Sequence, residues 1–316
     1  MTVRELLAPF LAQQEQPSAP AASDQDLSHL EATLEVQLPN DVRDLYRQTN
    51  GLTLTWFLDL LPITRSLELA QAMTTFEVPG PWGLVPLLDD GRSNPVCVAT
   101  RAPLTGFLIR VPHDDVKHLA HRDVVSLLRT LVEAPDFDDD ELPSPFAAQD
   151  RTVADAETAT ALIAQAGTIG ELSRRDALRF ALTLLGVQGV DVIASFLGDV
   201  DDDVRESARA RLGELAPHAE NAALALRHAK VEREDFARTC VRILNEAGLK
   251  ATFDRKSWGP EVRVEPGPFG LNLDAFWSWR AQPDFSGRLT TRVRELQALQ
   301  PKRPSSRPAA PGGSEA

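Results

Sequence analysis

The hydrophobic pattern of the chain changes character once, and this change limits the folds that it can adopt. Between residues 52 and 111, short apolar runs alternate with polar residues or are separated by turn residues, as in β-strands. From Ala154 to Leu249 the chain is rich in Ala, Leu, Arg and Glu, and its apolar residues keep helical spacing. Grouped strands among helices, followed by helices alone, predict an α+β protein. Its 316 residues exceed what one core usually serves, so we expect several domains.

The first half opens with two helices whose ends are well marked. Residues 27–34 place leucines at helical spacing, and a second helix begins near Pro39. Asn50 and Gly51 supply the left-handed stop that helix ends favour. The residues expected on the buried face of the second helix are Val42, Leu45 and Tyr46.

A series of short elements follows these two helices. The alternation of Leu52, Leu54, Trp56, Leu58 and Leu60 predicts one strand over residues 52–60. The other elements expected in this half are a helix at Ser66–Phe76, strands within 84–91, 96–98 and 106–111, and a closing helix at Val124–Leu131.

The helical half contains three similar segments. They are DALRFALTLLG from Asp176, DVRESARARLG from Asp203 and DFARTCVRILN from Asp235. Each begins with Asp, which is a good N-cap, has a small residue five positions later and Leu nine positions later, and ends in Gly or Asn. Offsets of 27 and 32 residues predict helix-turn-helix units stacked as a short solenoid.

The predicted organisation has six parts. They are an N-terminal helix and loop (1–25), an α+β domain (26–133), an acidic, proline-containing linker (134–153), helical repeats (154–249), a small segment with a hairpin and a helix (250–300), and a disordered Pro/Gly/Ser-rich tail (301–316). Trp277 and Trp279 are expected to be packing residues of the small segment.

The opening helices also carry a recognisable series: an acidic, leucine-containing helix, then Leu-Pro, then a helix that ends in Asn-Gly. Its residues are Glu31, Leu34, Leu38, Pro39, Leu45, Tyr46, Asn50 and Gly51. This series and the strands after it resemble the SMI1/KNR4, or SUKH, superfamily from about Asp26 to Glu133. The resemblance implies binding rather than catalysis, since many bacterial SUKH proteins are immunity proteins that neutralise toxins, often nucleases. Other members are interaction or scaffolding modules.

In the second half, residues 196–215 (FLGDVDDDVRESARARLGEL) resemble a HEAT repeat. In that family the turn Asp and the following Arg form a ladder between adjacent repeats, and Asp201 and Arg205 would be those residues here. The flanking repeats lack this Arg, so the ladder is expected to be incomplete. A HEAT array would add a second protein-binding surface. The predicted architecture is therefore a SUKH-like sheet-and-helix domain followed by a short α-helical, HEAT-like solenoid.

Charge and cysteine content narrow the classes of partner. The formal net charge is −13 and the pI is about 5.0, which repels nucleic-acid phosphates and favours a basic protein partner. Cys97 and Cys240 lie far apart in apolar runs, so we expect buried free thiols and a cytoplasmic protein. The N-terminal apolar run is too short for a signal peptide or a membrane span. No partner of the nucleic-acid or membrane class is expected.

Three polar segments resemble sites of chemistry, and each has a simpler explanation. In HDDVKHLAH, His118 and His121 could share a helix face and hold a metal, but no third ligand group is evident and the segment is expected to be a loop. The acidic run 136–141 lacks the glycine of a calcium loop and is expected to be solvated linker. The acids of residues 199–206 suit a helix N-terminus. We therefore expect no catalytic residue, no metal and no cofactor.

Three functions remain, in order of preference. The first is an immunity protein that binds a toxin domain with a basic surface, the second an intracellular scaffold or regulatory adaptor that uses both modules, and the third an enzyme or metal-dependent activity. A basic nuclease cleft would attract the acidic chain and speed association. The identity of the partner and the oligomeric state stay open. The loop residues expected to contact the partner are Asp89, Asp90, Asp114 and Asp115.

Overall fold

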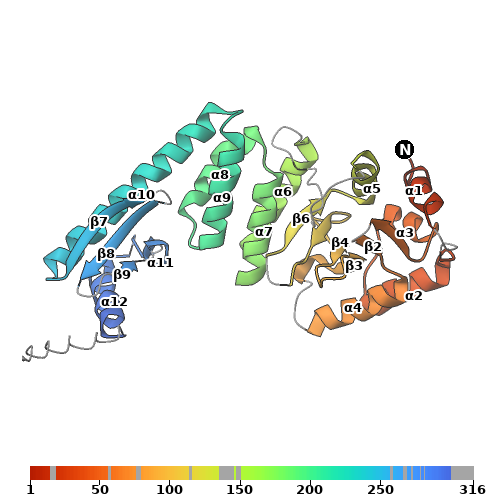
Figure 1. Cartoon of the computed structure of the whole chain (residues 1–316), viewed down its shortest axis with the longest axis horizontal. Coiled ribbons are helices and arrows are strands. Elements are labelled where there is room, and N and C mark those ends of the chain that lie inside the picture. Colours follow the sequence, from red (N-terminus) through yellow and green to blue (C-terminus); the bar gives the residue numbers. More distant parts are fainter. Residues whose placement is uncertain are drawn as a thin grey trace, which may run out of the picture. The chain divides into compact units, whose positions relative to one another are not determined.

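The structure is a computed structural model of the whole chain (Figure 1). It describes residues 1–14, 19–55, 58–75, 80–113, 116–134, 146, 151–256, 259–265, 269–271, 273–277, 279–280 and 282–299. The fold is α+β, as predicted: an antiparallel sheet with helices comes first and a helical region follows. The chain divides into two compact units, Met1–Gly198 with Asp203–Ala223, and Asp199–Asp202 with Leu224–Ala316.

The first unit is built around a six-stranded antiparallel meander, in which each strand pairs with the next one along the chain. Its strands are β1 Leu52–Thr55, β2 Leu58–Leu60, β3 Leu84–Asp89, β4 Val96–Ala99, β5 Leu108–Arg110 and β6 His118–His121. Alternate strands of a meander run in the same direction. The C-terminal ends of β1, β3 and β5 therefore lie at the same end of the sheet.

Two sequence predictions about this sheet were wrong. The single strand expected over residues 52–60 is a pair of antiparallel strands, with Leu52 opposite Leu60. The leucines of both strands face the core, so the alternation continues through the pair and does not reveal the reversal. The segment at His118–His121, expected to be a loop, is strand β6. Its short HLAH sequence has polar residues at both ends, which conceals the strand.

Five helices pack with this sheet: α1 Val3–Ala12, α2 Asp24–Leu34, α3 Asn40–Tyr46, α4 Ile63–Thr75 and α5 Val124–Glu133. Helix α1 contacts α3 and α5, whereas α2 contacts α4, which packs on β3 (Figure 1). Leu6 and Leu7 of α1 are fully buried in the same core as the sheet, so the N-terminal helix is part of this unit. Capping boxes at Thr2, Ser23 and Asp123 fix where α1, α2 and α5 begin.

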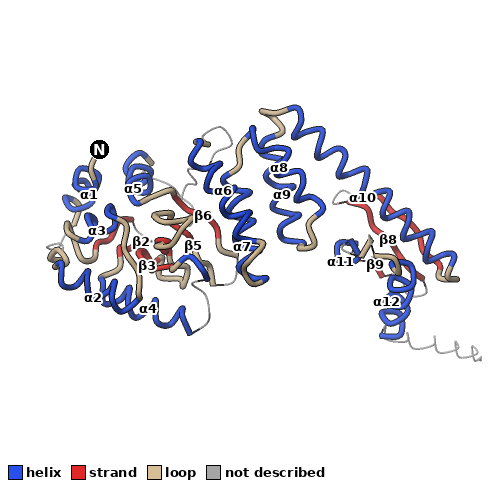
Figure 2. The backbone as a smooth tube through the Cα atoms, turned by 180° about the vertical axis from the view of Figure 1, so that it is seen from behind, coloured by secondary structure: helices blue, strands red, loops and turns tan. Residues whose placement is uncertain are grey.

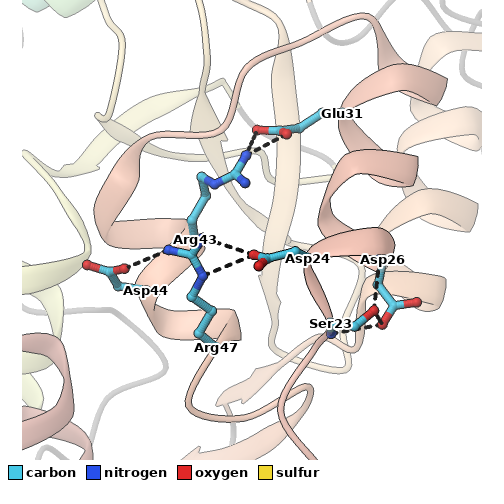
Figure 3. A network of polar contacts seen from close by, with 7 residues as sticks. All are labelled: Ser23, Asp24, Asp26, Glu31, Arg43, Asp44 and Arg47. Atoms are coloured by element: carbon cyan, nitrogen blue, oxygen red, sulfur yellow. Dashed lines mark hydrogen bonds and ion pairs between the residues drawn. The ribbon is translucent and has the colours of Figure 1, made fainter.

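The residues of the opening series hold α2, α3 and the sheet together. The Glu31 carboxylate accepts a hydrogen bond from the Leu38 amide at 2.9 Å. It also accepts hydrogen bonds from the Arg43 guanidinium at 2.6 and 2.7 Å (Figure 3). The Tyr46 hydroxyl donates to the Leu61 carbonyl at 3.1 Å, deep in the core. Glu31 therefore fixes the Leu-Pro connection, and Tyr46 anchors α3 to the chain after β2.

The predicted left-handed stop does not end α3: the helix ends at Tyr46, and its C-cap Arg47 is right-handed, so Asn50 and Gly51 form a turn beyond it. Gly51 has a φ of +123°, a backbone conformation that side chains with a Cβ rarely adopt. A Cβ at this position would also lie 3.1 Å from the Pro62 ring. The Asn50 side chain accepts a hydrogen bond from the Ile63 amide at 2.8 Å, so this turn also holds the start of α4.

The next helices of the first unit are α6 Val153–Ala166, α7 Glu171–Leu184, α8 Val190–Ser195 and α9 Asp202–Leu215. Helices α6 and α7 pack against each other, and α7 also contacts the edge strand β6 (Figures 1 and 2). Trp82 is fully buried at this junction, where its ring meets the Phe180 ring edge-on at 5.2 Å. Its indole N–H donates to the Gln165 side chain at 3.3 Å.

Two ion pairs also join the sheet to these helices. Lys117 lies 2.7 Å from Asp176 of α7, and Arg122 lies 2.8 Å from Asp155 of α6. Asp155 is almost completely buried and also closes the capping box of α6 with Thr152. The sheet and helices α6 to α9 therefore belong to one compact unit, apart from the first residue of α9.

The helix boundaries implied by the repeated segments were wrong. Asp176 and Asp235 lie inside helices rather than at their N-caps, and Gly213 and Asn245 lie inside helices rather than after them. The positions with small residues, and the Leu of each segment, are buried. The repeated pattern thus reports the buried face of each helix and not its ends.

The second unit has its own core. It contains most of α10 Glu220–Glu246, a three-stranded antiparallel sheet of β7 Lys250–Lys256, β8 Gly259–Glu265 and β9 Phe269–Leu271, and helices α11 Leu273–Trp277 and α12 Phe285–Leu299. Phe236 of α10 contacts the rings of Trp277 and Phe285, at 5.0 and 5.6 Å between centroids. Trp277 is buried, as expected of a packing residue. Among the described residues, no helix is long and apolar enough to cross a membrane.

Candidate functional site

The predicted partner-binding acids begin where β3 ends. Asp89 is the last residue of β3 and is half-buried, and its carboxylate accepts a hydrogen bond from the Gly91 amide at 3.2 Å. On the neighbouring strand β2, Asp59 lies directly opposite Asp89 and is exposed. Like charges placed opposite each other in a sheet destabilise it. The pair is therefore an acidic feature that packing does not require, and we call Asp59 and Asp89 the strand-end acids.

Asp90 has a different position. Its carboxylate accepts hydrogen bonds from the Arg92 amide and the Asn94 side chain, both at 2.8 Å, and from Arg110 at 3.1 Å. Only 6% of its side chain is exposed. Burial alone raises the pKa of Asp90, but the hydrogen bonds from Asn94, Arg92 and Arg110 outweigh it and hold this pKa below its ordinary value. Asp90 therefore organises the loop from within, and its role as a partner contact stays a prediction.

The loop after β3 is connected to the segment after β5. The Asn94 side chain accepts a hydrogen bond from the His113 amide at 3.1 Å. This contact agrees with the meander, which places the C-terminal ends of β3 and β5 at the same end of the sheet. Asp114 and Asp115, the other two predicted contacts, follow His113 in the chain but lie outside the described residues.

The histidine segment does not form the arrangement that its sequence resembles. His118 and His121 lie three residues apart on a strand, so they do not share a helix face; His118 is exposed and His121 is fully buried. Both imidazole nitrogens of His121 lack a hydrogen-bond partner, and burial lowers its pKa to about 4. In the part of the chain that the structure describes, no three His, Cys, Asp or Glu side chains are grouped as metal ligands.

The residues predicted to form a repeat ladder lie at the start of α9. The Asp201 amide donates to the Asp199 carboxylate at 2.9 Å, which is a turn ahead of the helix. Arg205 is 1% exposed and is among the largest fully buried side chains described. Its burial fits a structural position in the helical region, and the ladder itself stays a prediction.

The first unit contains both the opening series of α2 and α3 and the six-stranded meander. A comparison with known protein families points to the same family as this series. Residues 21–139 match the SMI1 / KNR4 family (SUKH-1). The match extends from the cap of α2 past the end of α5 and includes all six strands. This confirms the N-terminal resemblance inferred from the sequence. A comparison of the chain with curated proteins gives no match.

The family that residues 21–139 match has a general role of its own. Domains of this family are generally non-enzymatic modules for protein interaction. The HEAT-like resemblance of residues 154–249 is not confirmed by a family match and stays a prediction.

Sequence reasoning missed Asp59. It was the polar position in what looked like one continuous strand, and only the break between β1 and β2 places it beside Asp89. Asp59 could have been found by considering a hairpin in place of one strand over residues 52–60. The two strands of a hairpin present their polar residues on the same face of the sheet.

Proposed function

We propose that the chain is a non-catalytic, protein-binding immunity protein of the SUKH type that neutralises a toxin of a bacterial competition system. The observation that carries the proposal is the match of residues 21–139 to the SUKH-1 family. The buried free thiols of Cys97 and Cys240 suit a protein that acts in the cytoplasm of the cell that makes it.

Charge supports a partner with a basic surface. Residues 21–139 contain 18 acidic and 9 basic side chains, so most of the net charge of −13 belongs to this region. A nuclease toxin needs a basic cleft to hold phosphates. An acidic inhibitor approaches such a cleft faster than a neutral one, and this effect weakens as salt is added.

The strand-end acids are the described residues that we assign to this contact. Asp59 and Asp89 lie opposite each other at the cost of like-charge repulsion. Asp114 and Asp115 are proposed to extend the contact from the chain that follows β5. Asp90 supports the same loop through its bonds to Asn94 and Arg110.

The first experiment identifies the partner. The tagged chain is purified from its own cells, and the proteins that elute with it in stoichiometric amounts are identified by mass spectrometry. A single partner with a toxin domain, whose toxicity in a co-expression assay is suppressed by this chain, is the expected result. Several housekeeping proteins and no toxin would instead favour an intracellular scaffold or regulatory adaptor.

The second experiment tests the contact once the partner is known. The double variant Asp59→Asn/Asp89→Asn should associate several-fold more slowly at low salt, and with weaker salt dependence, because attraction at the strand ends is lost. Its free energy of unfolding should stay the same or rise, since the repulsion between the two carboxylates is also removed. Equal association rates for the variant and the wild type would exclude these acids from the contact.

A matched control separates the effect of the strand-end acids from that of the change in net charge. Glu35 at the end of α2 and Glu133 at the end of α5 are also exposed acids. The double variant Glu35→Gln/Glu133→Gln changes the net charge by the same amount. It should lower the association rate less than the strand-end variant does.

A further inference from the structure

A cavity of about 230 Å³ lies in the first unit, and its lining joins β6 to α7 and α9. For comparison, an engineered protein cavity of about 150 Å³ accepts a benzene molecule. The space is therefore large enough for a small molecule or a single functional group with water. It lies outside the strand-end acids and has no part in the function proposed above.

The lining of this cavity is basic, although the chain as a whole is acidic. Among the described residues, its lining contains four cations, Lys117, Arg151, Arg179 and Arg211, and one carboxylate, Glu214. The hydroxyls of Thr183 and Ser207 also line it, but each already donates to a carbonyl one turn earlier in its own helix. Recognition in this cavity therefore depends on the cations.

Arg211 is the best-defined of these cations. Its side chain is only 5% exposed, and its Nε donates to the Leu185 carbonyl at 2.9 Å. One terminal nitrogen, Nη1, donates to Glu214 at 2.5 Å. The other, Nη2, is buried without a hydrogen-bond partner. A buried donor on a charged group is costly to leave unsatisfied, so this nitrogen indicates a missing acceptor.

The other cations of the cavity differ in how far negative charge compensates them. Among the described residues, no side chain pairs with the Arg179 guanidinium, which lies half-buried on α7. Burial, together with the neighbouring charges of Arg211 and Arg122, lowers the pKa of Arg151 to about 10. Lys117, in contrast, is compensated by Asp176 at 2.7 Å. An anion beside Arg179 and Arg211 would supply the acceptor that Nη2 of Arg211 lacks.

We propose that this cavity binds a phosphate-type oxyanion, either inorganic phosphate or the phosphate group of a small monoester. Guanidinium groups present several N–H donors in a planar fork that matches the oxygens of phosphate. Arg151, Arg179 and Arg211 come from three separate places in the chain and all line the cavity. A phosphate group has more acceptor oxygens than a carboxylate, so it can accept hydrogen bonds from several arginines at once.

The test is calorimetric titration of the full chain with inorganic phosphate and, separately, with glycerol phosphate, at an ionic strength kept constant with sodium chloride. We expect saturable binding of at least one of them. Arg179→Gln should weaken it on the order of tenfold or more, because one charge-assisted contact is lost. Arg129→Gln is the matched control, since Arg129 is an exposed arginine on α5 outside the cavity.

Each outcome bears on the proposal. Tighter binding of glycerol phosphate would support a monoester as the ligand, and equal or tighter binding of inorganic phosphate would support the free ion. Circular dichroism checks that Arg179→Gln is folded; if it is not, Arg179→Lys, which keeps the charge but not the fork, should still weaken binding. Absence of saturable binding by the wild type up to roughly 10 mM, or equal losses in Arg179→Gln and Arg129→Gln, would overturn the proposal.

Discussion

At the scale of single residues, two acids of α2 show how strongly burial determines the contribution of an ion pair to stability. Glu31 and Asp24 each pair with an arginine of α3 or its end, at 2.6 and 2.9 Å (Figure 3). The Glu31 side chain is 14% exposed, whereas that of Asp24 is 74% exposed. Exposed pairs are screened by water and contribute little. Glu31 also accepts the Leu38 amide, so its loss leaves a backbone donor without a partner.

We therefore expect Glu31→Leu, which has no oxygen to accept from the Leu38 amide, to lower the free energy of unfolding by about 1–3 kcal/mol. Asp24→Asn, which removes the same charge from the same helix, should cost less than about 1 kcal/mol. Urea denaturation of both variants measures the difference. Equal costs would show that the Leu38 amide and the burial of Glu31 do not matter.

His121 makes the stability of the first unit depend on pH. Burial lowers its pKa from 6.5 to about 4, so the folded protein holds the imidazole neutral while the unfolded chain binds a proton below pH 6.5. This contribution to stability is complete above pH 6.5 and is lost as the pH falls towards 4. Its size is on the order of 3 kcal/mol.

The corresponding test compares urea denaturation at pH 7 and pH 4.5. Carboxylates also titrate in this range, so the informative quantity is the difference between wild type and His121→Phe. The variant should lose less stability on acidification. His29→Gln, at an exposed position on α2, should lose as much as the wild type does. Identical losses in all three proteins would contradict the assignment.

At the scale of elements, helix α2 ends in an unfavourable way. Its C-cap, Glu35, is exposed and has a φ of +53° and a ψ of +44°, the left-handed conformation that glycine adopts most easily. For other residues this conformation costs about 1–2 kcal/mol. Glu35→Gly should therefore raise the free energy of unfolding by about 1 kcal/mol, measured by urea denaturation. Glu35→Ala should give no such gain, because alanine keeps the left-handed cost; a gain in both variants would point to charge instead.

The elements that could be predicted from the sequence are those whose ends carry local signals. The Leu-Pro start of α3 and the Asn-Gly turn between α3 and β1 act within a few residues, so they are visible in the sequence. The reversal between β1 and β2 and the strand β6 depend on pairing with distant strands, which no local pattern records. For the same reason Asp89 could be predicted at the site and its cross-strand neighbour Asp59 could not.

At the scale of the whole molecule, the sequence showed two regions but not how they pack. The sequence analysis placed an acidic, proline-containing linker at residues 134–153. The structure shows that Trp82, before this segment, and Phe180, after it, meet in a shared core. These residues lie almost 100 positions apart, and each looks like an ordinary apolar residue of its own element. The basic cavity has the same origin, since its arginines are spread over α7, α9 and the segment just before α6.

This shared core predicts that the sheet and the helices through α9 unfold together. Phe180 is 1% exposed, so Phe180→Ala should lower the free energy of unfolding by about 3–5 kcal/mol. Hydrogen exchange at increasing denaturant concentration should show the amides of β6 and α7 losing protection together, in the wild type and, at lower concentration, in the variant. Leu172→Ala is the control on α7, since Leu172 is 74% exposed and should contribute within about 0.5 kcal/mol. Protection of β6 that survives after α7 has opened would mean that the SUKH-1 region folds independently of the helices packed on it.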